Sequence, residues 1–205
     1  YEAQGLTTQQ FYALLQSWIG ERILVDKSPS YVLDPAALHK AEADFDEPFY
    51  IHLVRHPYAM VRSFESYHMD QVLYLKEHNF APRQLGELVW LASHQNTLDF
   101  LSKIPAQRQL RISFETLVSQ PRTVMEEFCQ QMVIPFHPNL INPYHEIEKK
   151  MVNGIYADSN PMGDTRLLER QTIDPKVADQ WQAVANDNFL SESTWAVAQQ
   201  LGYEK

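Results

Sequence analysis

Three segments of the chain are predicted to be helices, from apolar residues at helical spacing or from signals for a helix start. The first covers residues 8–19 and stops at Gly20, a residue typical of helix ends. The second begins at Pro35, because the preceding Asp34 can cap a helix and proline suits a first turn. The longest covers residues 83–101, and its spacing predicts one broad apolar side that consists of Leu85, Leu88, Trp90, Leu91, Leu98 and Leu101.

Short apolar runs alternate with these helices. Residues 49–54 (FYIHLV), bounded by prolines, have the strongest strand pattern. Residues 23–25 (ILV) predict a short buried strand before a polar break, and residues 109–114 (QLRISF) predict another. Because strands alternate with helices, the sequence predicts an α/β fold, with a mostly parallel central sheet flanked by helices in a single domain over residues 1–205.

The last third of the chain has a weaker pattern. Pro121 opens a predicted helix that continues to Met132. Prolines and polar residues dominate residues 134–163, which predicts an irregular segment. Two further helical segments are expected around Trp181 and Trp195.

Composition and charge exclude several classes of protein. Lys+Arg 17 against Asp+Glu 26 gives a formal net charge of -9, which disfavours general binding to nucleic acid or to an anionic membrane. The single Cys129 excludes an intramolecular disulfide, and without an HExxH pair of histidines no metal is expected. No apolar run approaches the roughly 20 residues of a membrane helix, and no signal peptide opens the chain. A cytoplasmic location is therefore the expectation.

The six glycines supply a second exclusion. None forms a GxGxxG or GxxxxGK[ST] loop, so the sequence contains no glycine loop that cradles phosphate. If this chain handles a nucleotide, it must use side chains and helix N-termini. The other possibility is a loop upstream of Tyr1.

Arg55 directly follows the strongest strand, and Pro57 can start a helix just after it. Ligands of parallel α/β sheets bind at the carboxyl ends of strands, and helix N-termini attract anions. Ser63, in the following turns, can add a hydrogen bond. These residues indicate an anion site; the alternative is an arginine paired with a nearby carboxylate.

The turn at residues 26–29 (DKSP) follows the strand predicted at residues 23–25. A lysine there can neutralise negative charge that develops on a transferred group. The alternative is a solvated Lys27 in a turn, because lysine side chains are mostly exposed. The residues alone leave both interpretations open.

Three motifs, in this order along the chain, together resemble the sulfotransferases, enzymes that use the sulfonate donor PAPS (3′-phosphoadenosine 5′-phosphosulfate). Residues 25–31 (VDKSPSY) resemble the lysine segment of carbohydrate sulfotransferases, and residues 49–63 resemble the 3′-phosphate-binding motif. Residues 111–117 (RISFETL) resemble the third, in which Phe114 stands where the family has a tyrosine beside the adenosine. The resemblance implies that Arg55 and Ser63 hold the 3′-phosphate.

The same resemblance implies a P-loop-related sulfotransferase fold and a catalytic role for Lys27, which would stabilise the departing nucleotide, PAP. Family members carry a first strand and a loop for the 5′-phosphosulfate upstream of the lysine segment, and this sequence has neither. We expect that an N-terminal part of the domain precedes the given sequence. The alternative is a protein that has lost the donor chemistry.

Residues 80–96 are most similar to sulfotransferase domains of bacterial polyketide synthases. Those domains sulfonate the β-hydroxyl of an acyl chain on an acyl carrier protein, and the sulfate then leaves as a terminal olefin forms. The resemblance implies the same acceptor here, within a larger multidomain synthase. We expect residues 76–82 to form a mobile flap over this acceptor. Arg83 would then contact a carboxylate or thioester oxygen of the acceptor.

The general base and the acceptor are less defined by the sequence. Among eight histidines we choose His145, because residues 142–144 (NPY) should hold it rigidly; His68 and His94 remain alternatives. Other acceptors include a different small-molecule or carbohydrate hydroxyl. A non-catalytic module that binds a carrier protein is the rival from another class, and a kinase is a third. Candidates for a basic docking patch are Arg83, Arg108, Arg111 and Arg122.

Overall fold

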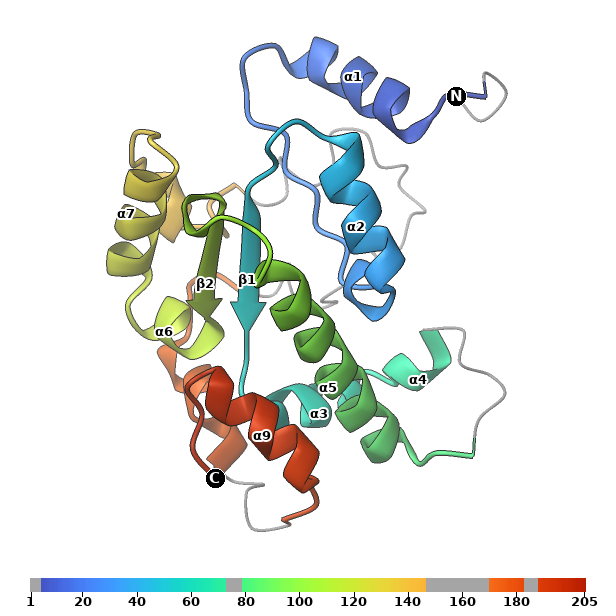
Figure 1. Cartoon of the computed structure of the whole chain (residues 1–205). Helices are drawn as coiled ribbons and strands as arrows, with labels where there is room; N and C mark the ends of the chain where they lie inside the picture. Colours follow the sequence, from blue (N-terminus) through green and yellow to red (C-terminus); the bar gives the residue numbers. More distant parts are fainter. Residues whose placement is uncertain (1–4, 73–78, 147–169, 183–187) are drawn as a thin grey trace. The chain divides into compact units, whose positions relative to one another are not determined.

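The chain forms two compact units, each with its own set of packed elements. The computed structural model (Figure 1) describes residues 5–72, 79–146, 170–182 and 188–205. The first unit consists of Tyr1–His52, Met60–Leu110 and Leu190–Lys205. The second unit consists of Leu53–Ala59 and Arg111–Phe189.

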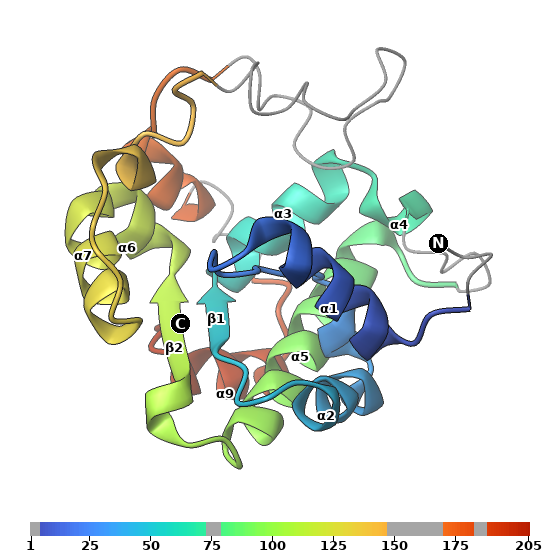
Figure 2. The ribbon, with the colours of Figure 1, turned by 90° about the horizontal axis from the view of Figure 1, so that it is seen from above.

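Two parallel strands form the sheet of the described residues. β1 (Tyr50–Val54) and β2 (Gln109–Ser113) pair and run in the same direction (Figures 1 and 2). Side chains alternate along β1, and those of His52 and Val54 are buried. The predicted α/β fold with a parallel sheet and flanking helices is confirmed, and so are the strands predicted at these two places.

The strand predicted for residues 23–25 is wrong. The backbone there is irregular, and the side chains of Ile23 and Val25 are 53% and 74% exposed. A strand forms only when its N–H and C=O groups find a partner strand. The sheet in the described part of the chain contains β1 and β2 alone. Apolar composition therefore did not suffice for a strand.

The predicted first helix is confirmed as α1 (Thr8–Ile19). Its N-terminus is a capping box, because the Thr7 hydroxyl accepts from the Gln10 N–H (3.2 Å) and the Gln10 side chain accepts from the Thr7 N–H (2.9 Å). The helix stops at Gly20, whose φ of 66° lies in the left-handed region that favours glycine. Local signals therefore fix both ends of α1.

The second predicted helix is α2 (Pro35–Asp44), preceded by a short 3₁₀ helix, η2 (Tyr31–Leu33). The Asp34 carboxylate accepts a hydrogen bond from the Ala36 N–H at 2.9 Å, as expected of an N-cap. Pro35 occupies the first helical position, where its missing N–H costs nothing. The cap and the proline thus act as the sequence predicts.

The long helix α5 (Pro82–Leu101) buries part of the side predicted for it, together with positions that were not predicted. Leu85, Trp90 and Leu101 are buried as predicted, whereas Leu88 is 42% exposed. Positions separated by about 3.6 residues share a helix face, which makes the observed side continuous. The buried residues are Leu85, Gly86, Trp90, Thr97, Phe100 and Leu101.

A hydrophobic cluster joins α5 to α2 within the first unit. Val32 and Tyr50 pack against it, and the Tyr50 and Phe100 rings meet edge to face at 4.9 Å. Such ring geometry adds to the area that burial removes from water. The cluster's buried members are Leu38, Phe100, Leu101 and Ile104.

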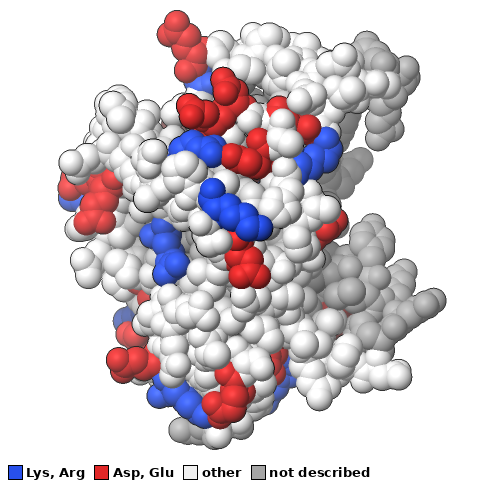
Figure 3. Space-filling model, viewed as in Figure 1, with Lys and Arg blue, Asp and Glu red and all other residues white. Residues whose placement is uncertain are grey.

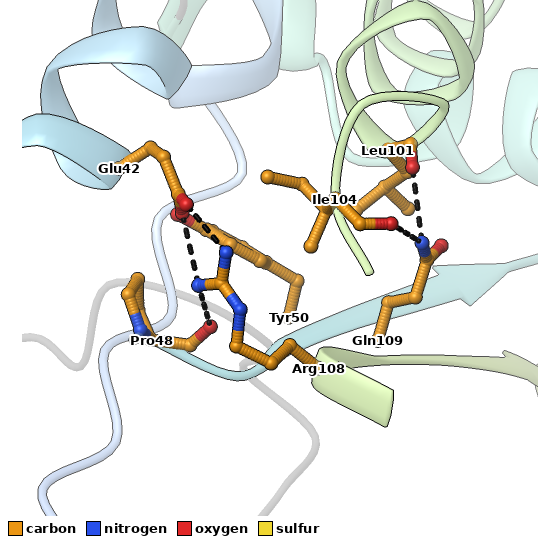
Figure 4. A network of polar contacts seen from close by, with 7 residues as sticks. All are labelled: Glu42, Pro48, Tyr50, Leu101, Ile104, Arg108 and Gln109. Atoms are coloured by element: carbon orange, nitrogen blue, oxygen red, sulfur yellow. Dashed lines mark hydrogen bonds and ion pairs between the residues drawn. The ribbon is translucent and has the colours of Figure 1, made fainter. Parts of the chain in front are cut away.

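Charged and polar contacts join the start of β2 to α2 (Figure 4). The Arg108 guanidinium, from the 3₁₀ helix η3 (Ala106–Arg108), contacts the Glu42 carboxylate at 2.6 Å and donates to the Pro48 carbonyl at 3.3 Å. The Tyr50 hydroxyl donates to the same carboxylate at 2.8 Å. The hydrogen bond from Arg108 is the main cause that lowers the pKa of Glu42.

Two more contacts shape the surroundings of α5. Gly86 approaches α3 (Pro57–Ser66) so closely that a Cβ there would lie 3.2 Å from the Phe64 ring. On another side, α9 (Glu192–Gln200) packs against α5, and the Glu87 carboxylate accepts from the Ser191 N–H at 2.6 Å. The helix predicted around Trp195 is confirmed as α9.

The second unit contains α6 (Phe114–Ser119), α7 (Pro121–Gln131) and two 3₁₀ helices, η4 (Pro138–Ile141) and η6 (Pro175–Ala178). The helix predicted from Pro121 is confirmed as α7. Cys129, on α7, is buried. Trp181 lies in a short 3₁₀ turn at residues 180–182, and residues 183–187, the next part of the helical segment predicted around it, lie outside the described residues. Most of the predicted irregular segment, from residue 147 on, lies outside them.

Acidic and basic side chains intermix on the face shown in Figure 3, without a large area of one sign. The net charge of -9 is therefore not concentrated in one patch of that face. Across the described ranges, every helix is too short or too polar to cross a membrane.

Candidate functional site

Arg55 and Phe114 lie together in the second unit. Arg55 follows the last residue of β1, and Phe114 follows the last residue of β2. The carbon at the centre of the Arg55 guanidinium is 4.4 Å from the centroid of the Phe114 ring. Because the strands are parallel, their carboxyl ends meet at one edge, and the residues that follow them become neighbours.

The backbone and side chains beside Arg55 are held by groups from elsewhere in the second unit. His56 is 2% exposed, and its ring stacks on Trp181 with centroids 3.7 Å apart and planes 7° apart. Burial lowers the pKa of His56 to about 4, although the charge of Glu115 opposes the shift. His56 is therefore neutral near pH 7. Of the two consecutive residues Arg55 and His56, only Arg55 carries a positive charge at that pH.

Glu115 connects the ends of the two strands. Its carboxylate accepts a hydrogen bond from the His56 backbone N–H at 2.8 Å and another from the Ser113 hydroxyl at 2.9 Å. Ser113 is also the N-cap of α6, where its hydroxyl oxygen accepts from the Thr116 N–H at 3.3 Å. One carboxylate thus holds backbone on both sides of the Arg55–Phe114 contact.

Ser63 belongs to the first unit and lies half-buried on α3, two turns after Pro57. Its carbonyl accepts from the Tyr67 N–H at 3.0 Å and from the Ser66 hydroxyl at 3.2 Å. Pro57 is the first residue of α3, as predicted. The joint hold of Arg55 and Ser63 on one phosphate stays a prediction.

Lys27 is exposed, in a turn of the first unit that Asp26 organises. The Tyr12 hydroxyl, from α1, donates to Asp26 at 2.5 Å, and the Ser28 hydroxyl donates to the other carboxylate oxygen at 3.0 Å. The hydrogen bond to Asp26 raises the pKa of Tyr12, so this hydroxyl stays protonated. The turn is held on both sides of Lys27.

Arg83, in the first turn of α5, forms an ion pair with Glu65 of α3. The Arg83 Nε lies 3.2 Å from each oxygen of the Glu65 carboxylate. The pair joins both ends of the connection between the two helices. The first part of the flap predicted for residues 76–82, residues 76–78, lies outside the described residues.

The three candidate bases have different surroundings. His145 lies in an exposed turn, where its backbone N–H donates to the Asn142 carbonyl at 3.2 Å. His68 is exposed, with a φ of 50°. A ring nitrogen of His94 lies 2.9 Å from one of His52, so His94 is engaged in a pair of imidazoles. The choice of His145 stays a prediction.

Sequence reasoning missed several residues that support the predicted ones: Tyr12, Glu65, Glu115 and Trp181. Each contacts a site segment from a distant part of the sequence. Only Glu115 lay within a motif, directly after Phe114, where its role was not recognised. Periodicity and caps describe local structure, and they carry no signal for such contacts.

The chain belongs to the sulfotransferase family. A family model described as "Sulfotransferase family" matches residues 2–138, well over half of the chain. This range includes the lysine turn, the end of β1 and the Arg55–Phe114 contact. No curated protein matches the chain at a significant level.

Two solved structures are similar to the chain over nearly its whole length. One is described as "Sulfotransferase Domain from the Curacin Biosynthetic Pathway", with 38% sequence identity and a TM-score of 0.86. The other is described as "Sulfotransferase Domain from the Synechococcus PCC 7002 Olefin Synthase", with 34% identity and a TM-score of 0.79. Each comparison covers 96% of this chain, but only 68% and 64% of the two solved chains, respectively.

Proposed function

We propose that this protein transfers a sulfonate group from PAPS to a hydroxyl group. The observation that carries the proposal is the cation at the carboxyl end of β1, set 4.4 Å from the Phe114 ring, in a chain of the sulfotransferase family. The donor has a 3′-phosphate and an adenosine. A guanidinium suits the phosphate, and an aromatic residue beside it suits the nucleoside.

Four residues of this chain bind the donor and assist the departure of the nucleotide. Arg55 and Ser63 bind the 3′-phosphate, and Phe114 lies beside the adenosine. Lys27 stabilises the negative charge on the nucleotide phosphate as it departs. The described residues fit this role in type, since Lys27 is exposed on a turn that Tyr12 and Ser28 hold through Asp26.

The reaction balances as a single group transfer. The bond between sulfur and the phosphate oxygen of PAPS breaks, and the bond between sulfur and the acceptor oxygen forms. The acceptor hydroxyl gives its proton to a base, for which we propose His145, and PAP leaves with the electron pair of the broken bond. A base of this kind contributes about 10²–10⁴-fold to the rate.

We further propose that the acceptor is the β-hydroxyl of an acyl chain on an acyl carrier protein, within a larger polyketide or olefin synthase. Support comes from the two similar structures, whose descriptions name curacin biosynthesis and an olefin synthase. Arg83, which Glu65 holds at the start of α5, would meet a carboxylate or thioester oxygen of that chain.

Transfer of labelled sulfonate tests the proposal on the intact natural protein. PAPS labelled with ³⁵S is offered with carrier-bound β-hydroxyacyl chains, the same chains without the hydroxyl, free alcohols and carbohydrates. We expect label on the carrier-bound hydroxyl substrate alone. Label on a free alcohol or sugar would contradict the proposed acceptor but would support the proposed sulfotransferase activity. A protein that binds the carrier without transferring label would be the non-catalytic module instead.

A further inference from the structure

The carboxylate of Glu115 lies between the two backbone segments that carry Arg55 and Phe114. Glu115 is the second residue of α6, directly after Phe114. Its oxygens accept from the His56 N–H at 2.8 Å and from the Ser113 hydroxyl at 2.9 Å. Each donor is the neighbour in sequence of one of the two residues of the Arg55–Phe114 contact.

The hydrogen bond to His56 holds the residue after Arg55. Residues 55 and 56 connect β1 to α3, so the His56 N–H lies between a strand and a helix. A charged acceptor binds a backbone N–H more strongly than a neutral one does. The Glu115 carboxylate therefore fixes the backbone from which the Arg55 side chain extends.

The hydrogen bond from Ser113 holds the residue before Phe114. The Ser113 hydroxyl donates its hydrogen to Glu115, so its lone pairs are left to accept from the Thr116 N–H at 3.3 Å, the N-cap contact of α6. The first turn of α6, where Phe114 lies, is thereby fixed by the same carboxylate. A change at Glu115 acts on both sides of the contact at once.

We infer that Glu115 is a positioning residue for the donor nucleotide, which acts through the Arg55–Phe114 contact without touching the nucleotide itself. The inference rests on the proposed function. A carboxylate repels phosphate, so its place beside an anion site needs a positive reason, and the two hydrogen bonds supply one. Removing the carboxylate should weaken binding of the 3′-phosphate, even though it also removes a negative charge that repels the phosphate.

The test compares Glu115→Gln and Glu115→Ala with Glu127→Gln, an exposed glutamate of α7 in the same unit. The measured quantity is the ratio of two dissociation constants, for adenosine 5′-monophosphate and for PAP, which differ only in the 3′-phosphate. We expect this ratio to be about 10-fold lower in both Glu115 variants than in the wild type, which is the effect of losing one charge-assisted hydrogen bond. The control should keep the wild-type ratio.

Three outcomes separate the possibilities. A wild-type protein that binds both nucleotides equally overturns the proposed function, and the inference falls with it. A preference for PAP that survives in both Glu115 variants overturns the role of Glu115 alone. If Glu115→Ala does not fold, the test of Glu115 rests on Glu115→Gln, whose side chain has the same shape as that of glutamate. Hydrogen exchange of the His56 amide should quicken in Glu115→Gln; unchanged exchange contradicts the positioning step.

Discussion

The Arg55 guanidinium lies 4.4 Å from the centroid of the Phe114 ring, although 59 positions separate the two residues in the sequence. Parallel pairing of β1 with β2 brings them together, because each residue directly follows a strand end. A cation over an aromatic face is stabilised by the ring's quadrupole and keeps a defined orientation. The sheet thus places a cation and a ring in one site.

Replacing Lys27 should slow the chemical step without weakening the donor complex. We expect Lys27→Ala to lower the single-turnover rate of sulfonate transfer by about 10²–10³-fold, as for loss of one stabiliser of a developing anion. The affinity for PAPS should stay within about twofold, because we propose that Arg55 and Ser63, and not Lys27, hold the 3′-phosphate. Lys103→Ala, another exposed lysine of the first unit, is the control. A wild-type rate in Lys27→Ala would contradict the role.

Replacing His145 should remove the base. The expected loss in single-turnover rate is about 10²–10⁴-fold, with unchanged affinity for both substrates. His137→Ala is a matched control, because His137 is also exposed and lies just before η4. Full activity in His145→Ala would transfer the role to His94 or His68, which the same measurement on His94→Ala and His68→Ala would decide.

The buried His56 should make the stability of the fold fall in mild acid. Its pKa of about 4 in the fold is below the value near 6.5 of a histidine in the unfolded chain. The unfolded chain therefore takes up the proton first, and the fold loses stability as the pH falls from 6.5 to 4.

The variant His56→Phe isolates this effect, since it keeps a ring against Trp181 and cannot take up a proton. The quantity of interest is the free energy of unfolding of the wild type minus that of the variant. We expect this difference to decrease as the pH is lowered from 6.5 to 4 and to be constant above pH 7. Urea denaturation at a series of pH values measures both. A difference that stays flat from pH 4 to 8 would show that His56 does not titrate as described.

The Tyr50 hydroxyl should contribute to stability through Glu42. Tyr50→Phe removes only the hydrogen bond to the Glu42 carboxylate and leaves the ring against Phe100. We expect the free energy of unfolding to fall by about 1 kcal/mol, the usual net value of such a bond. Tyr144→Phe is the control. If chemical denaturation shows the same loss in the free energy of unfolding for both substitutions, the hydrogen bond to Glu42 makes no specific contribution.

Local signals in the sequence predicted much of the fold. The Asp34–Pro35 pair and Gly20 mark helix ends through caps and turns that involve only near neighbours. The segment at residues 23–25 shows the limit, because a strand depends on a partner that local composition does not reveal. The buried side of α5 was only partly predicted, since Leu85 and Leu101 are buried but Leu88, at the same helical spacing, is exposed.

The site was predictable where residues follow strands. Arg55 was placed directly after a predicted strand, as the structure has it. Phe114 was placed inside the strand predicted for residues 109–114, whereas it is the first residue of α6, so its contact with Arg55 was not predicted. The contact of Trp181 with His56 and that of Glu65 with Arg83 could not be expected, since they join segments by tertiary packing. Chain order alone does not determine such pairs.

Nucleotide discrimination tests the central claim most directly. Calorimetry on the intact protein compares PAP with adenosine 5′-monophosphate, in the wild type, in Arg55→Ala and in the exposed control Arg122→Ala. We predict that the wild type and the control prefer PAP by ~1.5–3 kcal/mol, the range of charge-assisted hydrogen bonds, and that Arg55→Ala loses this preference. An Arg55→Ala protein that still prefers PAP by the wild-type margin would contradict the account.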